Sequence, residues 1–326
     1  MTDILFPIIM EKRVWLCIGI EKRKDMIYTV TLNPAIDYVA QLSGSLQLGG
    51  LNRNRNEAVF FGGKGINVSV VLAELGVDSV ALGFIAGFTG DGLEKGLQET
   101  GVHTDFIRVS QGLTRINVKI KAEEETEING IGPVITGADM QRLYDQLDKL
   151  TPEDCLVLSG SIPACLGDDA YETIMERLAG RGVSVVVDAS GKLLGNVLKY
   201  KPFLIKPNHH ELAELFGQQL QSDEQIADLA RRLQRQGARN VLVSMAGDGA
   251  LLLDEAGIVH RIGCPRGTVV NSVGAGDSMV AGFLAGYFET GDYDYALHLG
   301  TAAGSATAFS MGLADKEKIM KLLGQL

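Results

Sequence analysis

Small residues that lead into an apolar helix form the most informative segment of the sequence. Residues 271–282 read Asn-Ser-Val-Gly-Ala-Gly-Asp-Ser-Met-Val-Ala-Gly. The glycines at 274 and 276 leave backbone amides free at the start of the helix, where the helix dipole also attracts anions. Asp277 is either an ordinary helix cap or a carboxylate that orients a hydroxyl group against a phosphoryl group. We predict the second role, because a cap does not need the two glycines.

A second glycine-rich segment, Gly-Gly-Lys-Gly-Ile-Asn-Val, occupies residues 62–68. It differs from the Walker A motif, which requires Ser or Thr where this chain has Gly65. The first predicted strand is followed by Asn-Pro-Ala-Ile-Asp at 33–37 and not by the dinucleotide-binding fingerprint. These differences argue against an ordinary P-loop or Rossmann enzyme. Forty of the 326 residues are glycine, which predicts many tight turns or close approaches of backbone to ligand.

Positive charge is scarce in this chain, since 30 Lys and Arg face 40 Asp and Glu and give a net charge of −10. Such a protein is a poor candidate for non-specific nucleic-acid binding, which depends on cations that replace phosphate counterions. An anionic ligand would need cations gathered locally, and the candidates are Arg53, Lys64, Arg115 and Lys119. Arg115, Asn117 and Lys119 alternate along a predicted strand and share one face, which either binds phosphate or is simply exposed.

The order of elements predicts how these residues are positioned. From residue 26 onward, apolar β-rich runs alternate with helical patterns, which is typical of a parallel sheet covered by helices. Strands are expected at 27–32, 79–86, 155–159, 183–188, 203–206 and 241–244, and helices at 66–75, 138–150, 168–179, 223–236, 275–289 and 296–309. Residues 38–61 and 115–130 break the alternation and predict a small antiparallel β lid. We expect one α/β domain over residues 26–326.

Residues 1–25 differ from the rest, with two short apolar runs split by charges. Neither run reaches the roughly 18 residues needed to span a bilayer, and no signal-peptide pattern is present. We expect an N-terminal extension or a misassigned start, with a membrane-surface anchor as the alternative. The four cysteines have no metal-binding spacing, which predicts reduced thiols in a cytoplasmic protein.

The two glycine segments together, with Gly-Ala-Gly-Asp at 274–277, resemble the two signatures of the PfkB carbohydrate kinases. The resemblance extends from about residue 26 to the C-terminus and implies a ribokinase-like three-layer sandwich with a mostly parallel central sheet. It also implies a kinase that uses ATP and Mg²⁺. Segments 31–37, 114–119 and 206–211 resemble the family members that phosphorylate fructose 1-phosphate at O6. Tagatose 6-phosphate and fructose 6-phosphate are the alternative substrates.

The resemblance also implies a role for individual residues. Asp277 is the expected base, with Gly274 and Gly276 in the anion hole. The expected sugar-phosphate ligands are Asp37, Arg53, Gly62, Gly63, Lys64, Asn67, Arg115, Asn117 and Lys119. The expected nucleotide-binding residues are Ser244, Met245, Ala246, Gly247, Asp248, Gly249 and Gly276. Asn208 and Glu211 are expected to hold Mg²⁺ through water. The adjacent His209 and His210 do not converge on a helix, so zinc is set aside.

Partners and rival functions follow from the same features. Lid strands with bare edges predict a homodimer through the lid, and we expect neither nucleic-acid nor membrane partners. A catalytically silent sugar-phosphate sensor is a hypothesis of another class, and the presence of Asp277 with both glycines argues against it. A kinase of unphosphorylated sugars or nucleosides would leave Arg115 and Lys119 without an anion to bind.

Overall fold

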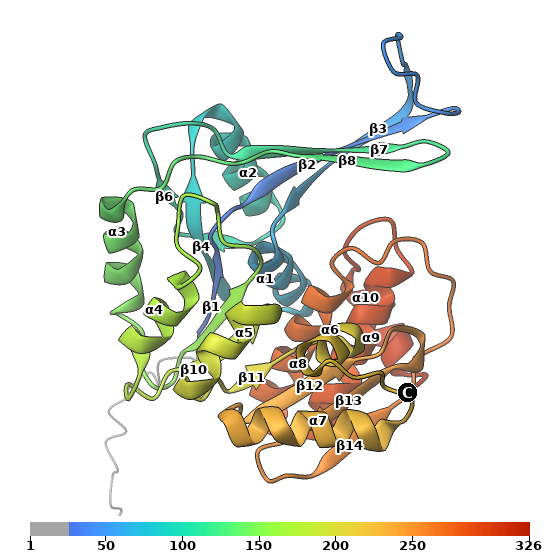
Figure 1. The fold of residues 1–326 in the computed structure, drawn as a ribbon. Helices are drawn as coiled ribbons and strands as arrows, with labels where there is room; N and C mark the ends of the chain where they lie inside the picture. Colours follow the sequence, from blue (N-terminus) through green and yellow to red (C-terminus); the bar gives the residue numbers. More distant parts are fainter. Residues whose placement is uncertain (1–25) are drawn as a thin grey trace, which may run out of the picture.

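The computed structural model describes residues 26–326, so the expected N-terminal extension over residues 1–25 lies outside the described residues. The central sheet contains β1 (Ile27–Thr31), β4 (Ser79–Ile85), β5 (His103–Thr104), β6 (Ile107–Arg108), β9 (Cys155–Ser159), β10 (Ser184–Asp188), β11 (Leu204–Ile205), β12 (Asn240–Ser244), β13 (Ala250–Leu253) and β14 (Val259–Ile262). Its order is β14-β13-β12-β11-β10-β9-β1-β4-β5, with β6 also paired to β4 (Figure 1). The β12–β13 and β13–β14 pairs are antiparallel, and the other pairs of this sheet are parallel.

Helices cover both faces of the sheet and produce the three layers. One face packs against α3 (Gly137–Leu147), α4 (Ala170–Leu178), α5 (Gly191–Val197), α6 (His209–Phe216) and α7 (Asp223–Gln236). The other packs against α1 (Lys64–Leu75), α8 (Ala275–Thr290), α9 (Tyr293–Ala308) and α10 (Lys316–Leu323). Leu156 contacts the first helix layer and Val157 the second, as successive strand residues must. Burial on both faces explains why the strands are almost continuously apolar.

The lid is a separate four-stranded sheet that projects from one edge of the core (Figure 1). Its strands are β2 (Ala35–Leu42), β3 (Asn54–Gly62), β7 (Arg115–Lys121) and β8 (Glu125–Asn129), in the order β3-β2-β7-β8. The expectation of a purely antiparallel lid is wrong in one respect, since β2 and β7 pair in parallel. Both strands leave the core at the same edge and run outward, and this fixes their relative direction. The helix α2 (Gly87–Glu99) packs beneath the lid.

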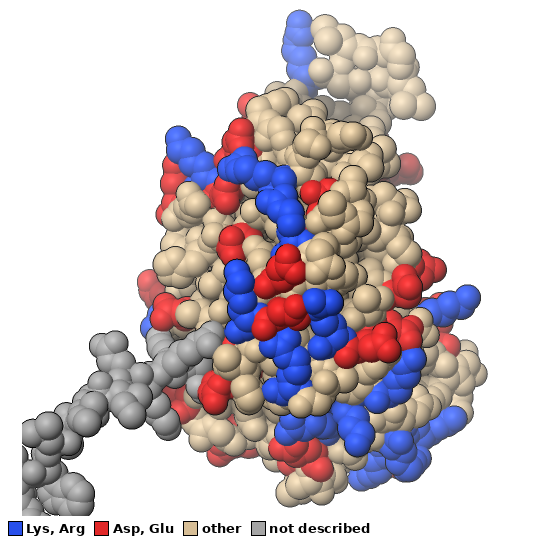
Figure 2. Space-filling view, turned by 90° about the vertical axis from the view of Figure 1, so that its left-hand side faces the viewer, with Lys and Arg blue, Asp and Glu red and all other residues tan. Residues whose placement is uncertain are grey.

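The surface formed by α3 and α4 carries charges of both signs, closely interspersed (Figure 2). Arg177 and Arg181 both pair with Asp148, and Arg108 pairs with Asp91 and Glu94. Exposed pairs of this kind contribute little to stability, but they neutralise one another. No helix within residues 26–326 combines the length and the apolar character needed to cross a membrane.

Candidate active site

A cavity of about 1050 Å³ lies where the carboxyl ends of β1, β9, β10, β11 and β12 meet the N-terminus of α8 and the base of the lid. It brings together fifteen of the residues that the sequence analysis singled out. They are Asp37, Gly63, Lys64, Asn67, Arg115, Asn117, Asn208, Glu211, Ser244, Ala246, Gly247, Gly249, Gly274, Gly276 and Asp277. These residues lie as many as 240 positions apart, from Asp37 to Asp277, so the fold alone places them in one cavity.

The expected site residues that do not line this cavity are Arg53, Gly62, Lys119, Met245 and Asp248. Arg53 is exposed on the lid, just before β3. Met245 is buried in the core at 3% exposure, because it follows directly on the buried strand β12. Gly62 packs against Asp37, where a Cβ at residue 62 would lie 3.0 Å from the carboxylate Oδ2. The structure therefore brings none of these side chains to the ligand space.

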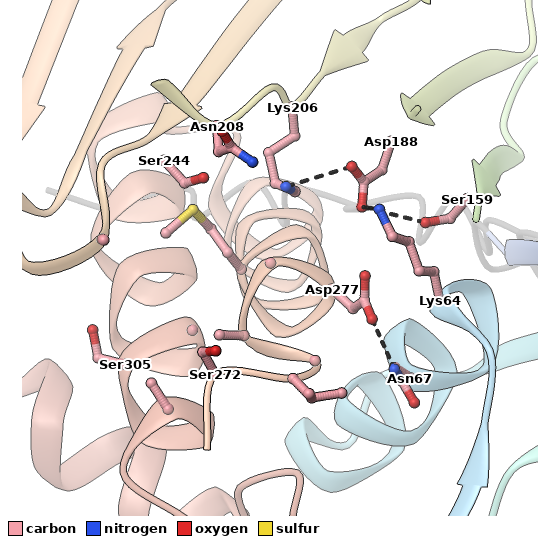
Figure 3. Close-up of a pocket in the computed structure, with 18 of the residues that line it drawn as sticks. Lys64, Asn67, Ser159, Asp188, Lys206, Asn208, Ser244, Ser272, Asp277 and Ser305 are labelled. Carbon is pink, nitrogen blue, oxygen red and sulfur yellow. Dashed lines mark hydrogen bonds and ion pairs between the residues drawn. The ribbon is translucent and has the colours of Figure 1, made fainter. Parts of the chain in front are cut away.

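Asp277 occupies the first turn of α8, but it does not cap the helix. The cap position is Gly274, whose φ of +81° is left-handed, and no side chain bonds there. Asp277 instead accepts a hydrogen bond from Asn67 Nδ2 on α1, at 2.7 Å from its Oδ2 (Figure 3). The amides of Gly276 and Asp277 have no partner within the helix. The first turn of α8 therefore presents free amides beside a carboxylate that has no capping role.

The environment of Asp277 raises its pKa to about 6. The largest cause is burial, at 5% exposure, and the second is repulsion by the carboxylate of Asp188. The hydrogen bond from Asn67 and the ammonium groups of Lys64 and Lys206 oppose the rise. A carboxylate with a pKa near 6 is mostly ionised at neutral pH and is a stronger base than an exposed aspartate.

An ion triad that the sequence motifs did not predict lies next to Asp277, and two of its three side chains, Asp188 and Lys206, are buried. Asp188 ends β10, and its two oxygens lie 3.5 Å from Lys64 Nζ and 3.4 Å from Lys206 Nζ (Figure 3). Burial alone would raise the pKa of Asp188, but the ammonium groups of Lys206 and Lys64 outweigh it and hold the pKa below its ordinary value. Burial would lower the pKa of Lys64, and the surrounding carboxylates, led by Asp188, raise it. The carboxylates thus favour the charged form of Lys64, close to the N-terminus of α8.

The role of Gly276 depends on this triad. A Cβ at residue 276 would lie 3.0 Å from Lys206 Nζ, so a glycine lets the ammonium group approach the first turn of α8. Asp188 and Lys206 are the charged residues at the ends of two predicted apolar strands, 183–188 and 203–206. In a parallel sheet such ends meet at one edge, and that signal was sufficient to find them.

At the other end of the cavity, two side chains of β7 hold Asp37. Asn117 Nδ2 donates to Asp37 Oδ1 at 2.8 Å, and Lys119 Nζ lies 3.5 Å from Asp37 Oδ2. Lys119 is also 3.8 Å from Glu127 Oε1 on β8, directly opposite in the ladder. Lys119 is thus neutralised by two carboxylates, and its position favours the orientation of Asp37 over direct contact with a phosphate.

Arg115 is the cation of the lid that lines the cavity. Its Nε donates to the main-chain oxygen of Asn33 at 3.1 Å, which leaves the two terminal nitrogens for an anion. Burial lowers the pKa of Arg115, and the carboxylate of Asp37 opposes this effect. The guanidinium stays charged at any ordinary pH and can bind two phosphate oxygens at once.

The glycines at 63 and 65 have a packing role that the sequence did not show. Gly63 has a φ of +127°, and a Cβ there would lie 2.5 Å from Thr31 Cγ2. A Cβ on Gly65 would lie 2.7 Å from Thr31 Oγ1 and 2.8 Å from the Val30 oxygen. These glycines let the start of α1 pack directly on β1, and this packing places Lys64 and Asn67 at the cavity wall.

Asn208 and Glu211 form the capping box of α6. Asn208 Oδ1 accepts from the Glu211 amide at 2.9 Å, and Glu211 Oε2 accepts from the Asn208 amide at 2.8 Å. The pair therefore has a structural role, while Glu211 Oε1 remains for another partner. One carboxylate supplemented by water and substrate phosphates suits Mg²⁺, so these residues fit the ion. His209 Nδ1 lies 3.3 Å from the Ser244 oxygen, and among residues 26–326 no group of three or more His, Cys, Asp and Glu is arranged to hold a metal.

The fold and this cavity define a class of protein, an α/β phosphotransferase in which the N-terminus of α8 and the base of a β lid line one cavity. The sequence model of the pfkB family carbohydrate kinases matches residues 29–319, and the chain belongs to this family. The expected ribokinase-like fold is thereby confirmed.

Individual relatives agree with the family assignment. The chain is 48% identical to a 1-phosphofructokinase of Bacillus subtilis, over 92% of this chain and 98% of that protein. It is 39% identical to a D-tagatose-1-phosphate kinase of Bacillus licheniformis, over 92% and 98% of the two chains. The crystal structure of phosphofructokinase-2 from Escherichia coli in complex with fructose-6-phosphate has a TM-score of 0.84 at 26% identity and covers 92% of this chain and 98% of that one.

Proposed function

We propose that residues 26–326 form one kinase domain, which transfers the γ-phosphoryl group of ATP to O6 of fructose 1-phosphate. The products are fructose 1,6-bisphosphate and ADP. The observation that carries the proposal is Asp277, a buried carboxylate with no capping role that lies beside free amides, the buried ammonium group of Lys206 and the half-exposed one of Lys64. The identity of 48% to a 1-phosphofructokinase supports the choice of sugar phosphate.

In the proposed complex, the lid end of the cavity binds the sugar phosphate. Arg115 takes the phosphate with its terminal nitrogens, because its Nε is already bonded to the Asn33 oxygen. Asp37 accepts hydrogen bonds from sugar hydroxyls, and Asn117 and Lys119 hold its carboxylate in place. These contacts leave O6, at the far end of the sugar from the phosphate, directed toward Asp277.

The core end carries out the transfer. Asp277 accepts the proton of the O6 hydroxyl as O6 bonds to the γ-phosphorus and the bond from that phosphorus to the bridging oxygen of ADP breaks. The amides at the start of α8 and the ammonium groups of Lys64 and Lys206 face the negative charge of the transferred group. Because phosphoryl transfer depends mainly on positioning and neutralisation, fixed donors of this kind are sufficient.

The nucleotide lies along the turn after β12 and the first turn of α8 in this proposal. Ser244, Ala246, Gly247 and Gly249 line the cavity there. Asn208 and Glu211 would hold Mg²⁺ through water, and the ion supplies further neutralisation of phosphate oxygens when it is bound.

The direct test is ADP release from Mg·ATP with a panel of sugar phosphates. We expect kcat/KM to be highest for fructose 1-phosphate and lower for fructose 6-phosphate and tagatose 6-phosphate. D-tagatose 1-phosphate is a second candidate, because a relative at 39% identity is a kinase of that sugar phosphate. Equal or higher kcat/KM on a 6-phosphate would contradict the proposal, as would activity on unphosphorylated fructose alone.

We also propose a homodimer formed through the lid. Val59, Ile116 and Ile128 are 54%, 42% and 59% exposed, and the ladder registers place them on the lid face opposite Asp37. A second lid would cover this apolar face. Light scattering on the purified protein tests the dimer, and a strict monomer at micromolar concentration would overturn it. ATP and reduced thiols are both typical of the cytoplasm, where we propose that the enzyme works.

A further inference from the structure

Buried polar atoms without a partner are concentrated at the cavity. Among the described residues they are Asn33 Oδ1, Asn117 Oδ1, Thr301 Oγ1 and Gln146 Oε1. The first three belong to residues that line the cavity, and only Gln146 does not. A buried acceptor without a donor is costly, and native structures rarely leave one without a reason. Their concentration indicates a ligand that brings hydrogen-bond donors.

Two of these atoms lie at the lid end of the cavity. Asn33 follows β1, and its main-chain oxygen accepts from Arg115 Nε at 3.1 Å. Asn117 is on β7 and donates to Asp37. Both side chains are more than nine-tenths buried, at 8% and 7% exposure. Any anion held by Arg115 therefore lies next to Asn33, and the body of that ligand lies within reach of the orphaned acceptor.

The two asparagines differ in how firmly they are held. Asn117 Nδ2 has a bond of 2.8 Å to a carboxylate, so its amide is fixed. Asn33 Nδ2 has one contact of 3.4 Å, to the Ile131 oxygen, which is near the limit of a hydrogen bond. The terminal torsion of asparagine is broad, so Asn33 can turn its Oδ1 into the cavity at the loss of that contact alone. In the structure, Oδ1 lies in a slot beside Gly132, where a Cβ would be only 2.3 Å away.

We propose that Asn33 is a specificity-determining residue, whose Oδ1 accepts a hydrogen bond from a ring hydroxyl of the sugar phosphate. The inference rests on the proposed function and deepens it. Asp37 Oδ1 already accepts a hydrogen bond from Asn117, whereas Asn33 Oδ1 is an acceptor without a partner until a ligand binds. A site built around such an acceptor rejects analogues that lack the hydroxyl, because the acceptor then stays buried and unpaired.

The test is a thermodynamic cycle in which the Asn33 side chain and a sugar hydroxyl are removed separately and together. We would compare wild type with Asn33→Leu, a similar volume without an acceptor, on fructose 1-phosphate and on its 3-deoxy and 4-deoxy analogues. For wild type, loss of the recognised hydroxyl should lower kcat/KM about 10- to 100-fold. Asn33→Leu should show a similar loss on fructose 1-phosphate and no further loss on that analogue. The KM for ATP should stay unchanged.

Two further variants secure the interpretation. Asn33→Ala is smaller, also lacks an acceptor, and carries the same test if the leucine variant does not fold. Asn196→Leu is the matched control, since Asn196 is exposed on α5 and does not line the cavity. If the Asn33 variants discriminate among the three substrates as wild type does, this inference is wrong while the proposed function stands. If wild type releases no ADP with any sugar phosphate, both are overturned.

Discussion

The core edge and the lid contribute to one cavity, yet they are built in opposite ways. Every residue of β9 is buried, and every residue of β8 is exposed. The core holds Asp277 and Asp188 at 5% and 3% exposure, and its charges meet within an apolar frame. The lid is a thin projecting sheet that contacts α2 near the core, and Asp37 and Lys119 keep side-chain exposures of 18% and 14% within it. We infer that the core fixes the geometry of transfer and that the lid governs which sugar phosphate is held.

This division predicts that core variants change kcat and lid variants change KM. Asp277→Asn should therefore have the largest effect. We expect kcat to fall by about 10²- to 10⁴-fold, because the base is lost while the hydrogen bond to Asn67 survives in part. Steady-state kinetics should show a nearly unchanged KM for the sugar phosphate. Asp145→Asn, at an exposed position of α3, is the control, and a normal kcat in Asp277→Asn would refute the mechanism.

Asp188→Asn tests the core as a charged unit. The change leaves two ammonium groups unpaired, and Lys206 is only 6% exposed at its side chain, so the free energy of unfolding should fall by about 3–5 kcal/mol. Urea unfolding measures the loss. Because the folded pKa of Asp188 lies below its ordinary value of 3.8, the stabilisation is present at neutral pH and is lost as the pH falls below that value. Equal stability of variant and wild type at pH 7 would show that the triad is not a structural unit.

Arg115→Met tests the lid. Loss of two charge-assisted hydrogen bonds should raise the KM for the sugar phosphate about 10- to 100-fold. The kcat at saturation should change little, because Arg115 is remote from the transferred group. Lys121→Met, two positions beyond Lys119 on the same strand, is the matched control. A fall in kcat without a rise in KM would break the proposed division between lid and core.

The smallest effect concerns the pH profile. Since the pKa of Asp277 is raised to about 6 and the ionised form is the base, kcat/KM should fall tenfold per pH unit below about pH 6. Lys206→Met removes an ammonium group that opposes the rise, so the acidic limb should move to higher pH. Lys192→Met, exposed on α5, should leave the limb in place. If the acidic limb of kcat/KM lies at the same pH in Lys206→Met as in wild type, the ionisation of Asp277 does not determine that limb.

The sequence predicted the core more completely than the lid. Apolar runs and glycine motifs are local signals, and they located the strands, α8 and Asp277. The direction of β7 against β2 has no local signal, because side chains alternate equally in parallel and antiparallel pairs. Lys119 was expected to bind phosphate because the sequence does not show which strand lies beside β7. Its pairing with Glu127 depends on that neighbouring strand, β8. Asp188 and Lys206 had a local signal, the charged residue at the end of an apolar strand. Their approach to α8, however, depends on the tertiary fold, which no local signal describes.

The parallel pairing of β2 with β7 also bears on the order of folding. Asp37 and Asn117 are 80 positions apart, and β3, α1, β4, α2, β5 and β6 lie between them along the chain. A contact of such separation is expected to form only after the intervening segment has docked on the core. The entropy lost on closing a long loop is larger than the stabilisation that this one contact provides. The lid is therefore expected to form late and to open first, so its amides should exchange hydrogen before those of the core strands.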